Sequence, residues 1–424
     1  MIRIVAREDP EFAPLVRSLV DRAAGVPESI EAAARDVIRQ VRAGGDRAVR
    51  ELTARFEGRQ LDALEIPPAE WRGAVDRIDR AVVRAIERAV ERVRAFHEHE
   101  RYAAFELREG GGTRIGMRVA ALGRVGIYVP GGKARYPSTV VMTAVPARVA
   151  GVGEIVMTTP GPSLETLAAA SLSGVDRVFS IGGAQAVAAL AYGTASVPRV
   201  DKIVGPGNAY VAAAKRLVFG DTGIDSIAGP TELVIAADAS AEPRWVAADL
   251  LAQAEHDELA VPVLVAVGRA VAERVAEALA AQLAVLPRRA IAEQALRHQG
   301  AILVVETALE AVELVEQLAP EHAELALADA RALAARITTA GALFLGNYTP
   351  ESVGDYMAGP SHVLPTAGSA RFASPLGVAD FVKRTSIIEY DAATLREQAA
   401  DIRRLAEVEG LDAHAEAVRI RFPD

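Results

Sequence analysis

The chain has 424 residues, of which 51% are hydrophobic and 24% are charged, as in ordinary globular proteins of roughly two to four domains. Its formal charge of −9 disfavours binding to nucleic acid or to an anionic membrane surface, so we expect neither partner. The absence of cysteine excludes disulfides, thiolate metal ligands and a cysteine nucleophile. No secretory signal is recognisable over Met1–Glu11, which favours a cytoplasmic protein.

The first hundred residues are predicted to be helical. An Ala-rich amphipathic run extends from Ser29 to about Ala43, and Gly44-Gly45 should end it. Pro67-Pro68 should open a longer helix with one apolar stripe. The stripe consists of Val83, Ile86, Val90, Val93 and His97. We expect His97 and the nearby His99 to be solvated or packed through their stems rather than to act as ligands.

From Gly123 to Ala236, short apolar runs alternate with Ala-rich helical segments at intervals of about 25 residues. This alternation is typical of right-handed crossovers in a parallel sheet. The expected strands are Val125–Val129, Glu154–Thr158, Arg177–Ser180, Lys202–Val204 and Leu233–Ala236. The expected helices are Ser138–Val149, Leu164–Ser173, Ala184–Ala191 and Asn208–Val218.

The pattern repeats more loosely beyond these segments and predicts a second open α/β sheet. Its expected strands are Val261–Val267, Ala301–Val305 and Ala342–Leu345, with helices at Trp245–Gln253, Val271–Leu283, Leu309–Leu318 and Ala328–Ile337. From about Asp380 the chain becomes a polar tail. One strand and two helices are expected there, at Thr385–Glu389, Ala392–Glu407 and Leu411–Ile420. The tail has too few apolar residues for its own core and should pack on another body.

Three glycine-rich turns follow predicted strands, at Tyr128–Gly132, Ile181–Gly183 and Gly205–Asn208. Each could place backbone N–H groups and a helix N-terminus beside a phosphate. None is the GxGxxG fingerprint of dinucleotide-binding proteins, and any one glycine pair is explained by a tight turn. Three such turns on successive strand ends favour nucleotide or phosphate binding, because ligands of open sheets bind at the carboxyl ends of strands.

Several histidines lie near potential acids or ligands, but their spacing leaves two readings open. Gln253 and His256 are three apart at a helix end, where they could chelate a metal or form an ordinary polar terminus. Glu321 and His322 could be a general acid/base pair, or a capping glutamate beside a packed histidine. His298 is expected to be a cation at a helix C-terminus.

Two further pairs lie nearer the end of the chain. Asp355 and His362 are seven apart in a loop rich in Gly and Pro, a composition that favours a functional loop. Glu409 and His414 lie in the tail. Their spacing alone indicates no more than a helix cap and a surface histidine.

Taken together, these segments resemble the histidinol dehydrogenase family. The resemblance runs in the family's order from about Arg124 to the tail and covers nearly all of the chain after the first hundred residues. It rests on GIYVPGGKARYPSTV, IGGAQAVAALAYGT, KIVGPGNAYVAAAKR, GIDSIAGPTELVIAAD, DLLAQAEH, APEHAEL, GDYMAGPSHVLPT, SPLGVADFVKR and EGLDAHAEAV. The family has serine where this chain has Thr231 and asparagine where it has Ser361. Both departures could alter affinity without changing the ligand set.

The resemblance assigns roles to the ambiguous residues. It implies one zinc ion per subunit bound by Gln253, His256, Asp355 and His414, and it makes Glu321 and His322 the catalytic pair. The implied contacts to the substrate L-histidinol are Thr231, Gln253, His256, His322, Asp355, Glu409 and His414. The implied contacts to NAD are Tyr128, Gln185 and Asn208, one from each glycine turn.

The resemblance also implies a reaction, in which L-histidinol is oxidised through L-histidinal to L-histidine with one hydride passed to each of two NAD molecules. His322 would be the general base, and Glu321 would activate water in the aldehyde step. With no cysteine to form a thiohemiacetal, a hydrate is the expected intermediate of that step. The alternative is a related enzyme that oxidises another small alcohol, such as a sulfonated diol. Retention of Glu409 and His414 argues against it.

The expected fold is α/β, with two Rossmann-like open sheets of mainly parallel strands and a small tail domain formed by the N- and C-terminal segments. Residues 1–22 should pack with the tail. Residues 23–124 together with 232–379 should form a first domain carrying the zinc site, and residues 125–231 a second domain carrying the NAD-binding turns. Because the family is a homodimer with a shared active site, residues 380–424 should reach the partner subunit.

Overall fold

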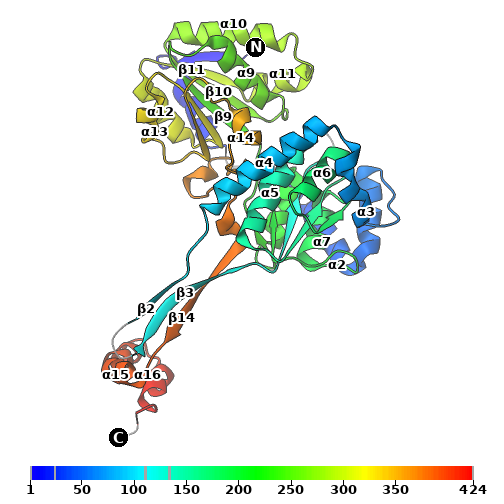
Figure 1. Cartoon of the computed structure of the whole chain (residues 1–424). Coiled ribbons are helices and arrows are strands. Elements are labelled where there is room, and N and C mark those ends of the chain that lie inside the picture. Colours follow the sequence, from blue (N-terminus) through cyan, green and yellow to red (C-terminus); the bar gives the residue numbers. More distant parts are fainter. Residues whose placement is uncertain (1, 23–24, 109–111, 132–134, 423–424) are drawn as a thin grey trace. The chain divides into compact units, whose positions relative to one another are not determined.

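The computed structural model describes residues 2–22, 25–108, 112–131 and 135–422. The chain divides into two compact units, which are described separately (Figure 1). The larger unit contains residues 1–100 and 122–381, and the smaller unit contains residues 101–121 and 382–424. The larger unit carries two parallel sheets, which confirms the predicted α/β class with two open sheets.

A six-stranded parallel sheet forms the core of one half of the larger unit, with the strand order β1-β11-β10-β9-β12-β13. Its strands are β1 (Arg3–Ala6), β9 (Glu232–Ala237), β10 (Val261–Val267), β11 (Ala301–Val305), β12 (His322–Ala326) and β13 (Ala342–Leu345). Helices α9 (Pro243–Ala254), α10 (Arg269–Leu283) and α11 (Arg289–His298) cover one face. Helices α1 (Phe12–Val20), α12 (Ala308–Leu318) and α13 (Ala330–Ala334) cover the other (Figure 1). Burial on both faces explains why most of these strands are continuous apolar runs.

The N-terminal segment belongs to this sheet, so the prediction that residues 1–22 pack with the tail is wrong. Strand β1 pairs in parallel with β11, with Arg3 opposite Ala301. The apolar face of α1, including Phe12 and Leu15, is buried in the core that contains α12. A short apolar strand gains both ladder hydrogen bonds and a buried face at this sheet edge, which a polar tail cannot offer.

A five-stranded parallel sheet with the order β6-β5-β4-β7-β8 forms the other half of the larger unit. Its strands are β4 (Arg124–Tyr128), β5 (Glu154–Thr158), β6 (Arg177–Phe179), β7 (Lys202–Val204) and β8 (Gly223–Ile224). The accompanying helices are α5 (Pro137–Ala150), α6 (Leu164–Leu172), α7 (Gly183–Tyr192) and α8 (Ala209–Val218). The strands expected between residues 125 and 204 are therefore confirmed to within a residue or two at their ends.

Helix α2 (Glu28–Glu57) packs against α7 and α8, with Val37 and Leu52 in the core of the five-stranded sheet. The expected grouping of residues 23–124 with the zinc-site domain is therefore wrong for this helix. The expected end at Gly44-Gly45 is a kink instead, because Gly45 adopts φ 54° and ψ −139° and the helix resumes after it. Glycine tolerates this conformation, so the apolar face can be redirected without ending the helix.

The helix predicted after Pro67-Pro68 is divided into three parts. A short helix α3 (Pro68–Arg72) and a 3₁₀ turn η1 (Gly73–Arg77) precede α4 (Arg80–Glu98), whose N-terminus is capped by Asp79. The predicted apolar stripe of α4, from Val83 to His97, is buried as expected. The Nδ1 atom of His97 lies 2.6 Å from a carboxylate oxygen of Glu100, so this histidine is packed and paired within the chain.

The smaller unit contains an antiparallel sheet with the order β14-β3-β2 and two helices. Its elements are β2 (Phe105–Arg108), β3 (Arg114–Ala121), β14 (Val382–Glu389), α15 (Ala392–Val408) and α16 (Asp412–Arg419). The strand and both helices predicted for the tail are confirmed, whereas the β2–β3 hairpin was not predicted. The hairpin supplies the pairing surface that the tail lacks by itself.

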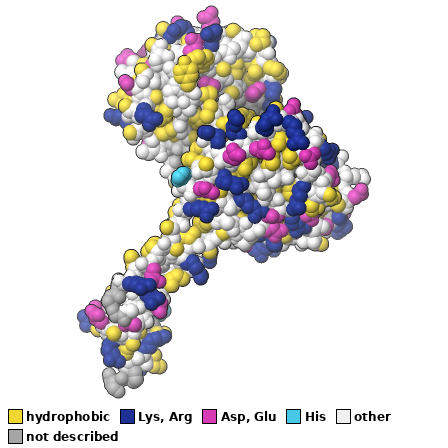
Figure 2. Space-filling view, in the orientation of Figure 1, with side chains coloured by type: hydrophobic (Ala, Val, Ile, Leu, Met, Phe, Trp, Pro, Cys, Tyr) yellow, Lys and Arg dark blue, Asp and Glu magenta, His cyan; other side chains and the backbone are white. Residues whose placement is uncertain are grey.

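The surface carries charges of both signs. Figure 2 shows Lys and Arg side chains interspersed with Asp and Glu over the visible face of the molecule. In the part of the chain that the structure describes, none of the helices has the length and apolar composition needed to cross a membrane.

Candidate active site

The predicted catalytic pair lies where two adjacent strands begin. Thr231 and Glu232 stand at the start of β9, and Glu321 and His322 at the start of β12, in the register His322 opposite Leu233. Helix α9 follows β9 and returns toward the start of β10, which brings Gln253 at its C-terminal end back to the same edge. The candidate site therefore lies at the amino ends of β9 and β12.

The carboxylate of Glu321 is buried and held by two donors. Its Oε2 atom accepts a hydrogen bond from the Thr231 hydroxyl at 2.7 Å and another from the Glu232 backbone N–H at 2.9 Å. Burial raises the pKa of Glu321 to about 8, although both hydrogen bonds favour the ionised form. A carboxyl group with a pKa in this range can accept and release protons near neutral pH.

The ring of His322 has a defined orientation. Its Nδ1 atom lies 2.9 Å from the backbone carbonyl oxygen of Glu232, and that oxygen can only accept a hydrogen bond. Nδ1 therefore carries a proton in the neutral ring and Nε2 carries the lone pair. The Nε2 atom lies 3.8 Å from Oε1 of Glu351, the buried first residue of α14 (Glu351–Tyr356). His322 is thus oriented to accept a proton through Nε2.

Three side chains offer ligand atoms close to one another. A nitrogen of His322 and one carboxylate oxygen each of Glu351 and Asp355 lie within 4.8 Å of one another. Burial raises the pKa of Glu351 to about 8. Burial would also raise the pKa of Asp355, but hydrogen bonding to His362 and the nearby histidines lower it below its usual value. Asp355 is therefore the carboxylate of this group that is ionised at neutral pH.

The predicted zinc ligands of the larger unit lie around this cluster. His256 interacts electrostatically with both Asp355 and His322, and burial lowers its pKa, which keeps the imidazole neutral. Gln253 is fully buried and donates from Nε2 to the Thr231 hydroxyl at 2.7 Å. The structure thus brings Gln253, His256 and Asp355 to the predicted catalytic pair.

Two of these side chains have buried polar atoms without a hydrogen-bond partner among the described residues, namely Oε1 of Gln253 and Nδ1 of His256. Leaving such atoms unsatisfied is costly, so they indicate where a ligand would bind. A neutral imidazole, an amide oxygen and an ionised carboxylate form a nitrogen and oxygen donor set that suits zinc. The residues present therefore fit the predicted metal.

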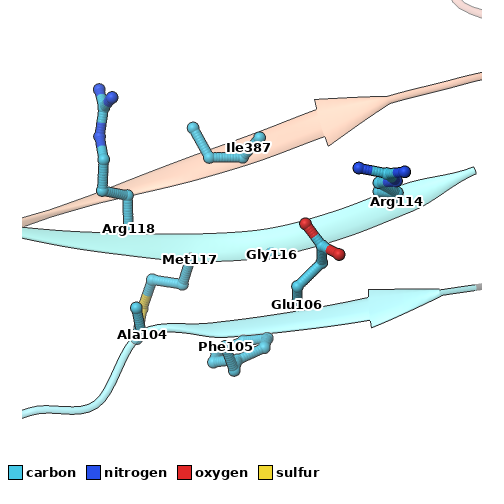
Figure 3. A pocket seen from close by; sticks show the side chains of 8 residues that line it. All are labelled: Ala104, Phe105, Glu106, Arg114, Gly116, Met117, Arg118 and Ile387. Carbon is cyan, nitrogen blue, oxygen red and sulfur yellow. The ribbon is translucent and has the colours of Figure 1, made fainter.

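The two predicted site residues of the tail belong to the smaller unit. His414 is exposed on α16, and Glu409 is exposed at the C-terminal cap of α15. The same unit has an open groove of about 360 Å³ on its three-stranded sheet (Figure 3). Its lining consists of Ala104, Phe105, Glu106, Arg114, Gly116, Met117, Arg118 and Ile387. None of the predicted site residues lines this groove.

The three predicted NAD contacts make contacts within the chain at the glycine turns. The Tyr128 hydroxyl accepts a hydrogen bond from Gly183 N–H at 3.0 Å, and Gln185 donates to Glu57 at 3.2 Å. Burial raises the pKa of Tyr128 to about 12, so the phenol stays protonated. Asn208 caps α8, because its side-chain oxygen accepts from two backbone N–H groups at 3.1 Å. Their contact with a dinucleotide stays a prediction.

The third glycine turn requires glycine for steric reasons. Gly205 adopts φ +108°, and a Cβ atom there would lie 2.2 Å from the carbonyl oxygen of Tyr128. Such close approach explains this glycine without a phosphate. The first turn was predicted to extend to Gly132, which lies outside the described residues, as do Lys133 and Ala134.

The sequence did not identify Glu232, Glu351 or Arg22, all of which contribute to this site. The signal for Glu351 was present, because Glu351 and Asp355 are four apart and lie on one face of a helix. Glu232 lies beside Glu321 and His322, and its carboxylate is bound by Arg22, which follows α1. His362 joins the site from its loop, with Nδ1 3.5 Å from Asp355 Oδ1.

Comparisons of sequence and of structure with known proteins all find the same family over nearly the whole chain. The family model described as histidinol dehydrogenase matches residues 20–422. The chain is 48% identical over 428 residues to the histidinol dehydrogenase of Nitrosomonas europaea, covering 99% of each protein. It is 49% identical over 430 residues to that of Syntrophotalea carbinolica, covering 100% of each. The crystal structure of histidinol dehydrogenase from Elizabethkingia anophelis superposes with a TM-score of 0.93 at 31% identity, covering 99% of this chain and 98% of that one.

Proposed function

Because the chain belongs to the histidinol dehydrogenase family of oxidoreductases, we propose that it oxidises L-histidinol through L-histidinal to L-histidine with two molecules of NAD. One observation carries this proposal. A buried Glu321, which accepts two hydrogen bonds, lies beside a His322 whose ring orientation is fixed, at one edge of a sheet. This pair stands beside a donor set that fits a metal. The alternative substrate, another small alcohol, receives no support from the relatives compared above.

In the first oxidation, Nε2 of His322 takes the proton of the substrate hydroxyl. The Glu232 carbonyl supports this role, because it fixes the proton on Nδ1 and leaves Nε2 basic. When bound, NAD accepts the hydride that leaves the carbinol carbon. The imidazolium that forms at His322 lies near the ionised carboxylate of Asp355, which can balance its charge.

In the second oxidation, the ionised carboxylate of Glu321 removes a proton from water as the water oxygen attacks the aldehyde carbon. The carbonyl oxygen takes the proton that His322 holds from the first oxidation, so the product is a neutral hydrate and His322 is again a base. His322 then takes a hydroxyl proton from the hydrate while the hydride on the hydrate carbon passes to the second NAD, which yields the carboxylic acid. Since the chain has no cysteine, a thiohemiacetal on an enzyme thiol is excluded. Retaining the aldehyde between steps avoids releasing a reactive compound.

The zinc site would consist of Gln253, His256 and Asp355, with the partner subunit's His414 as the fourth ligand. When bound, zinc would supply a positive charge that attracts nitrogen lone pairs of the substrate. Thr231 would fix Gln253 in place, since its hydroxyl accepts the amide Nε2–H and donates to Glu321. Both hydrogen bonds need only the hydroxyl group, which threonine shares with serine, so threonine can replace serine here.

We further propose a cytoplasmic homodimer in which Glu409 and His414 complete the partner's site. Both residues are exposed in the smaller unit, as expected of side chains that act elsewhere. Large apolar side chains are also exposed on the same helical pair, including Leu405 and Val408 at 66% and 81%. Such exposure favours burial against another chain. Tyr128, Gln185 and Asn208 remain the proposed contacts to NAD.

The test is a stoichiometric assay with L-histidinol as the sole substrate. Two NADH per histidinol consumed, lost on chelation and restored by zinc, would support the proposal. One NADH per histidinol with release of histidinal would contradict the second step. Reduction with another small alcohol but not with histidinol would favour the alternative enzyme.

A further inference from the structure

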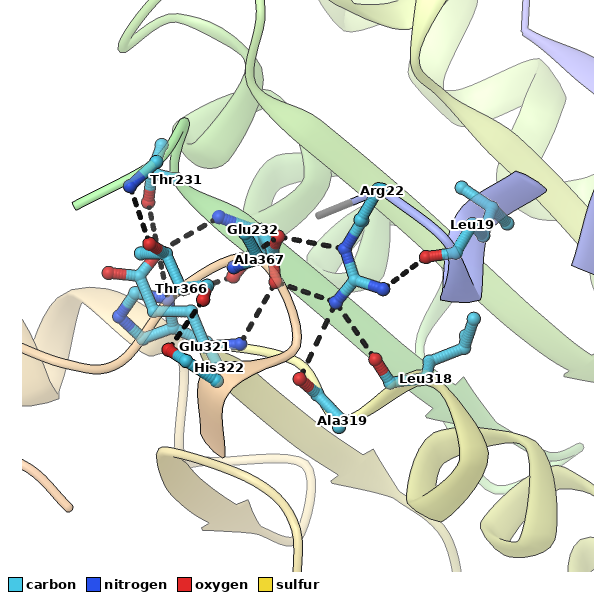
Figure 4. A network of polar contacts seen from close by, with 12 residues as sticks. Leu19, Arg22, Thr231, Glu232, Leu318, Ala319, Glu321, His322, Thr366 and Ala367 are labelled. Atoms are coloured by element: carbon cyan, nitrogen blue, oxygen red, sulfur yellow. Dashed lines mark hydrogen bonds and ion pairs between the residues drawn. The ribbon is translucent and has the colours of Figure 1, made fainter. Parts of the chain in front are cut away.

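Glu232 contacts the catalytic pair through both its backbone and its side chain (Figure 4). Its N–H donates to Oε2 of Glu321 at 2.9 Å, and its carbonyl accepts from Nδ1 of His322 at 2.9 Å. Its carboxylate accepts the backbone N–H of Glu321 at 3.3 Å through Oε2 and that of Ala367 at 2.9 Å through Oε1. One residue therefore fixes both catalytic side chains and the backbone of one of them.

The carboxylate of Glu232 is buried and has one positive partner among its described contacts. Glu232 is 2% exposed, and Arg22 meets it with two parallel hydrogen bonds, Nε to Oε1 at 2.8 Å and Nη2 to Oε2 at 2.7 Å. The Arg22 side chain is itself only 13% exposed. A two-pronged pair with so little solvent contact fixes the orientation of both side chains more strongly than a surface pair does.

Arg22 also holds the backbone that leads into the catalytic pair. Its Nη2 atom donates to the carbonyl oxygens of Leu318 at 2.8 Å and Ala319 at 3.4 Å. Leu318 is the last residue of α12, and Ala319 caps that helix in a left-handed conformation with φ 48°. Carbonyl groups at a helix C-terminus lack partners within the helix, so Arg22 satisfies them. Only Pro320 separates this capped end from Glu321.

We propose that Arg22 and Glu232 form a positioning pair for Glu321 and His322, an inference that rests on the proposed function. Without Arg22, the buried carboxylate of Glu232 loses its counter-charge and turns away. The backbone N–H of Glu321 then loses its acceptor, and the carbonyl groups at the C-terminal end of α12 lose the hydrogen bonds from Arg22. The catalytic dipeptide shifts, and a small displacement of a catalytic group lowers turnover steeply.

The pair should act on turnover rather than on binding of metal or substrate. In the described part of the chain, the side chains of Arg22 and Glu232 form no hydrogen bond to Gln253, His256 or Asp355. Thr231 links Glu321 to the proposed zinc ligand Gln253, but its hydroxyl can still accept from Gln253 when Glu321 shifts, so zinc binding should change much less than turnover. This separates a positioning role from general damage to the site.

The experiment compares Arg22→Met with Arg7→Met in the zinc-loaded enzyme. Arg7 also lies in the N-terminal segment and also pairs with α12, through Glu310 at 2.5 Å, but its side chain is 56% exposed. We expect Arg22→Met to lower kcat for both histidinol and histidinal by about tenfold or more. The KM for histidinol and the zinc content should change little. Arg7→Met should match the wild type in all four quantities.

Arg22→Lys keeps the charge without the planar fork and covers the case in which Arg22→Met does not fold. Its kcat should fall between those of the wild type and Arg22→Met, or below the wild type if the Met variant is insoluble. Wild-type kcat in a folded Arg22→Met or Arg22→Lys enzyme would overturn the positioning role. So would a loss confined to zinc content or to histidinol KM. A wild-type enzyme that does not oxidise histidinol would instead overturn the proposed function.

Discussion

The Nδ1 atom of His322 lies 2.9 Å from the backbone carbonyl oxygen of Glu232, so the ring presents its basic Nε2 atom to the site. We predict that His322→Asn lowers kcat for both oxidations by about 10²–10⁴-fold, the usual contribution of a general base. The residual rate should rise with pH as hydroxide replaces the base. Steady-state assays with histidinol and with histidinal check this. An equal fall in zinc content would mean that the residue acts as a ligand instead.

Glu321 should affect the two oxidations unequally. In the proposed mechanism only the aldehyde step requires Glu321 to activate water, so Glu321→Gln should slow oxidation of histidinal by about 10²-fold or more and that of histidinol much less. The expected sign is accumulation of histidinal and fewer than two NADH per histidinol. Equal slowing of both steps would contradict the assignment. Thr231→Ser keeps the hydroxyl that bonds Glu321 and serves as the matched control.

The pH dependence of histidinal oxidation follows from the same carboxyl group. Burial raises the pKa of Glu321 to about 8, and only the ionised form can take a proton from water. The rate should therefore rise with pH and level off above that pKa. A bound cation lowers the pKa, so the midpoint is expected at or below about pH 8 in the zinc enzyme. In Glu321→Gln this rise should disappear, and its persistence would assign it to another group.

Much of the fold could be predicted because its strands are apolar runs. Val261–Val267 and Ala301–Val305 are buried on both faces of a parallel sheet and were predicted with the bounds they have. Strand β12 was missed because it begins with the polar sequence His322-Ala323-Glu324. This sequence can be buried because residues distant in the chain form hydrogen bonds with His322 and Glu324. Local pattern cannot show such partners.

The site could be predicted only in part, for the same reason. Gln253, His256 and Asp355 were assigned through resemblance. In the structure the return of α9 brings Gln253 and His256 to the site, and α14 supplies Asp355. The pairing of Arg22 with Glu232 joins residues 210 positions apart and has no periodic signal. The placement of residues 1–22 was wrong because an edge strand of four residues is too short for its pairing partner to be read from its composition.

The glycine turn beside Asn208 is braced by a buried ion pair. Lys215 donates to the carbonyl of Gly205 at 2.9 Å and to Asp225, whose other oxygen accepts the Gly205 N–H at 2.7 Å. We predict that Lys215→Met lowers the free energy of unfolding by about 3–5 kcal/mol, because a buried carboxylate loses its partner. It should also raise the KM for NAD. Urea unfolding and NAD titration of turnover check both effects.

The neighbouring residue provides the control for that substitution. Arg216 is 55% exposed and lies 3.9 Å from Glu31, so Arg216→Met should change the free energy of unfolding by less than about 1 kcal/mol. If the two variants have the same free energy of unfolding, the burial of the Lys215–Asp225 ion pair does not contribute to stability. If Lys215→Met is destabilised but its KM for NAD is unchanged, this turn does not contact the dinucleotide.

A second buried pair makes stability depend on pH. Burial raises the pKa of Glu324 on β12 to about 9 and that of Asp249 on α9 to about 6, and these two carboxyl groups are hydrogen-bonded. The folded state keeps protons that the unfolded chain releases at about pH 4, so the stability contributed by this pair should be full below that pH and should be lost as pH rises toward 9. Glu324→Gln should lessen this fall, because the amide stays neutral at every pH.

Urea unfolding of the chelated protein at several pH values checks this slope. Glu316 gives a control of opposite sign. Although partial burial would raise the pKa of Glu316, hydrogen bonds from Thr338 and Thr339 lower it, so its contribution is present at neutral pH and lost in acid. Glu316→Gln should therefore be destabilised at neutral pH and approach the wild type as pH falls. An alkaline slope that is unchanged in Glu324→Gln would contradict the role of the buried pair.

Zinc should stabilise the folded protein through Asp355. An ion that binds only the folded state raises the melting temperature in proportion to the logarithm of its free concentration above Kd. After chelation, zinc should therefore raise the Tm of the wild type. In Asp355→Asn the rise should be abolished or shifted to much higher zinc, because the one carboxylate of the cluster with a lowered pKa is lost. Asp238→Asn, at the opposite end of β9, should keep the full rise. An undiminished response in Asp355→Asn would place the metal elsewhere.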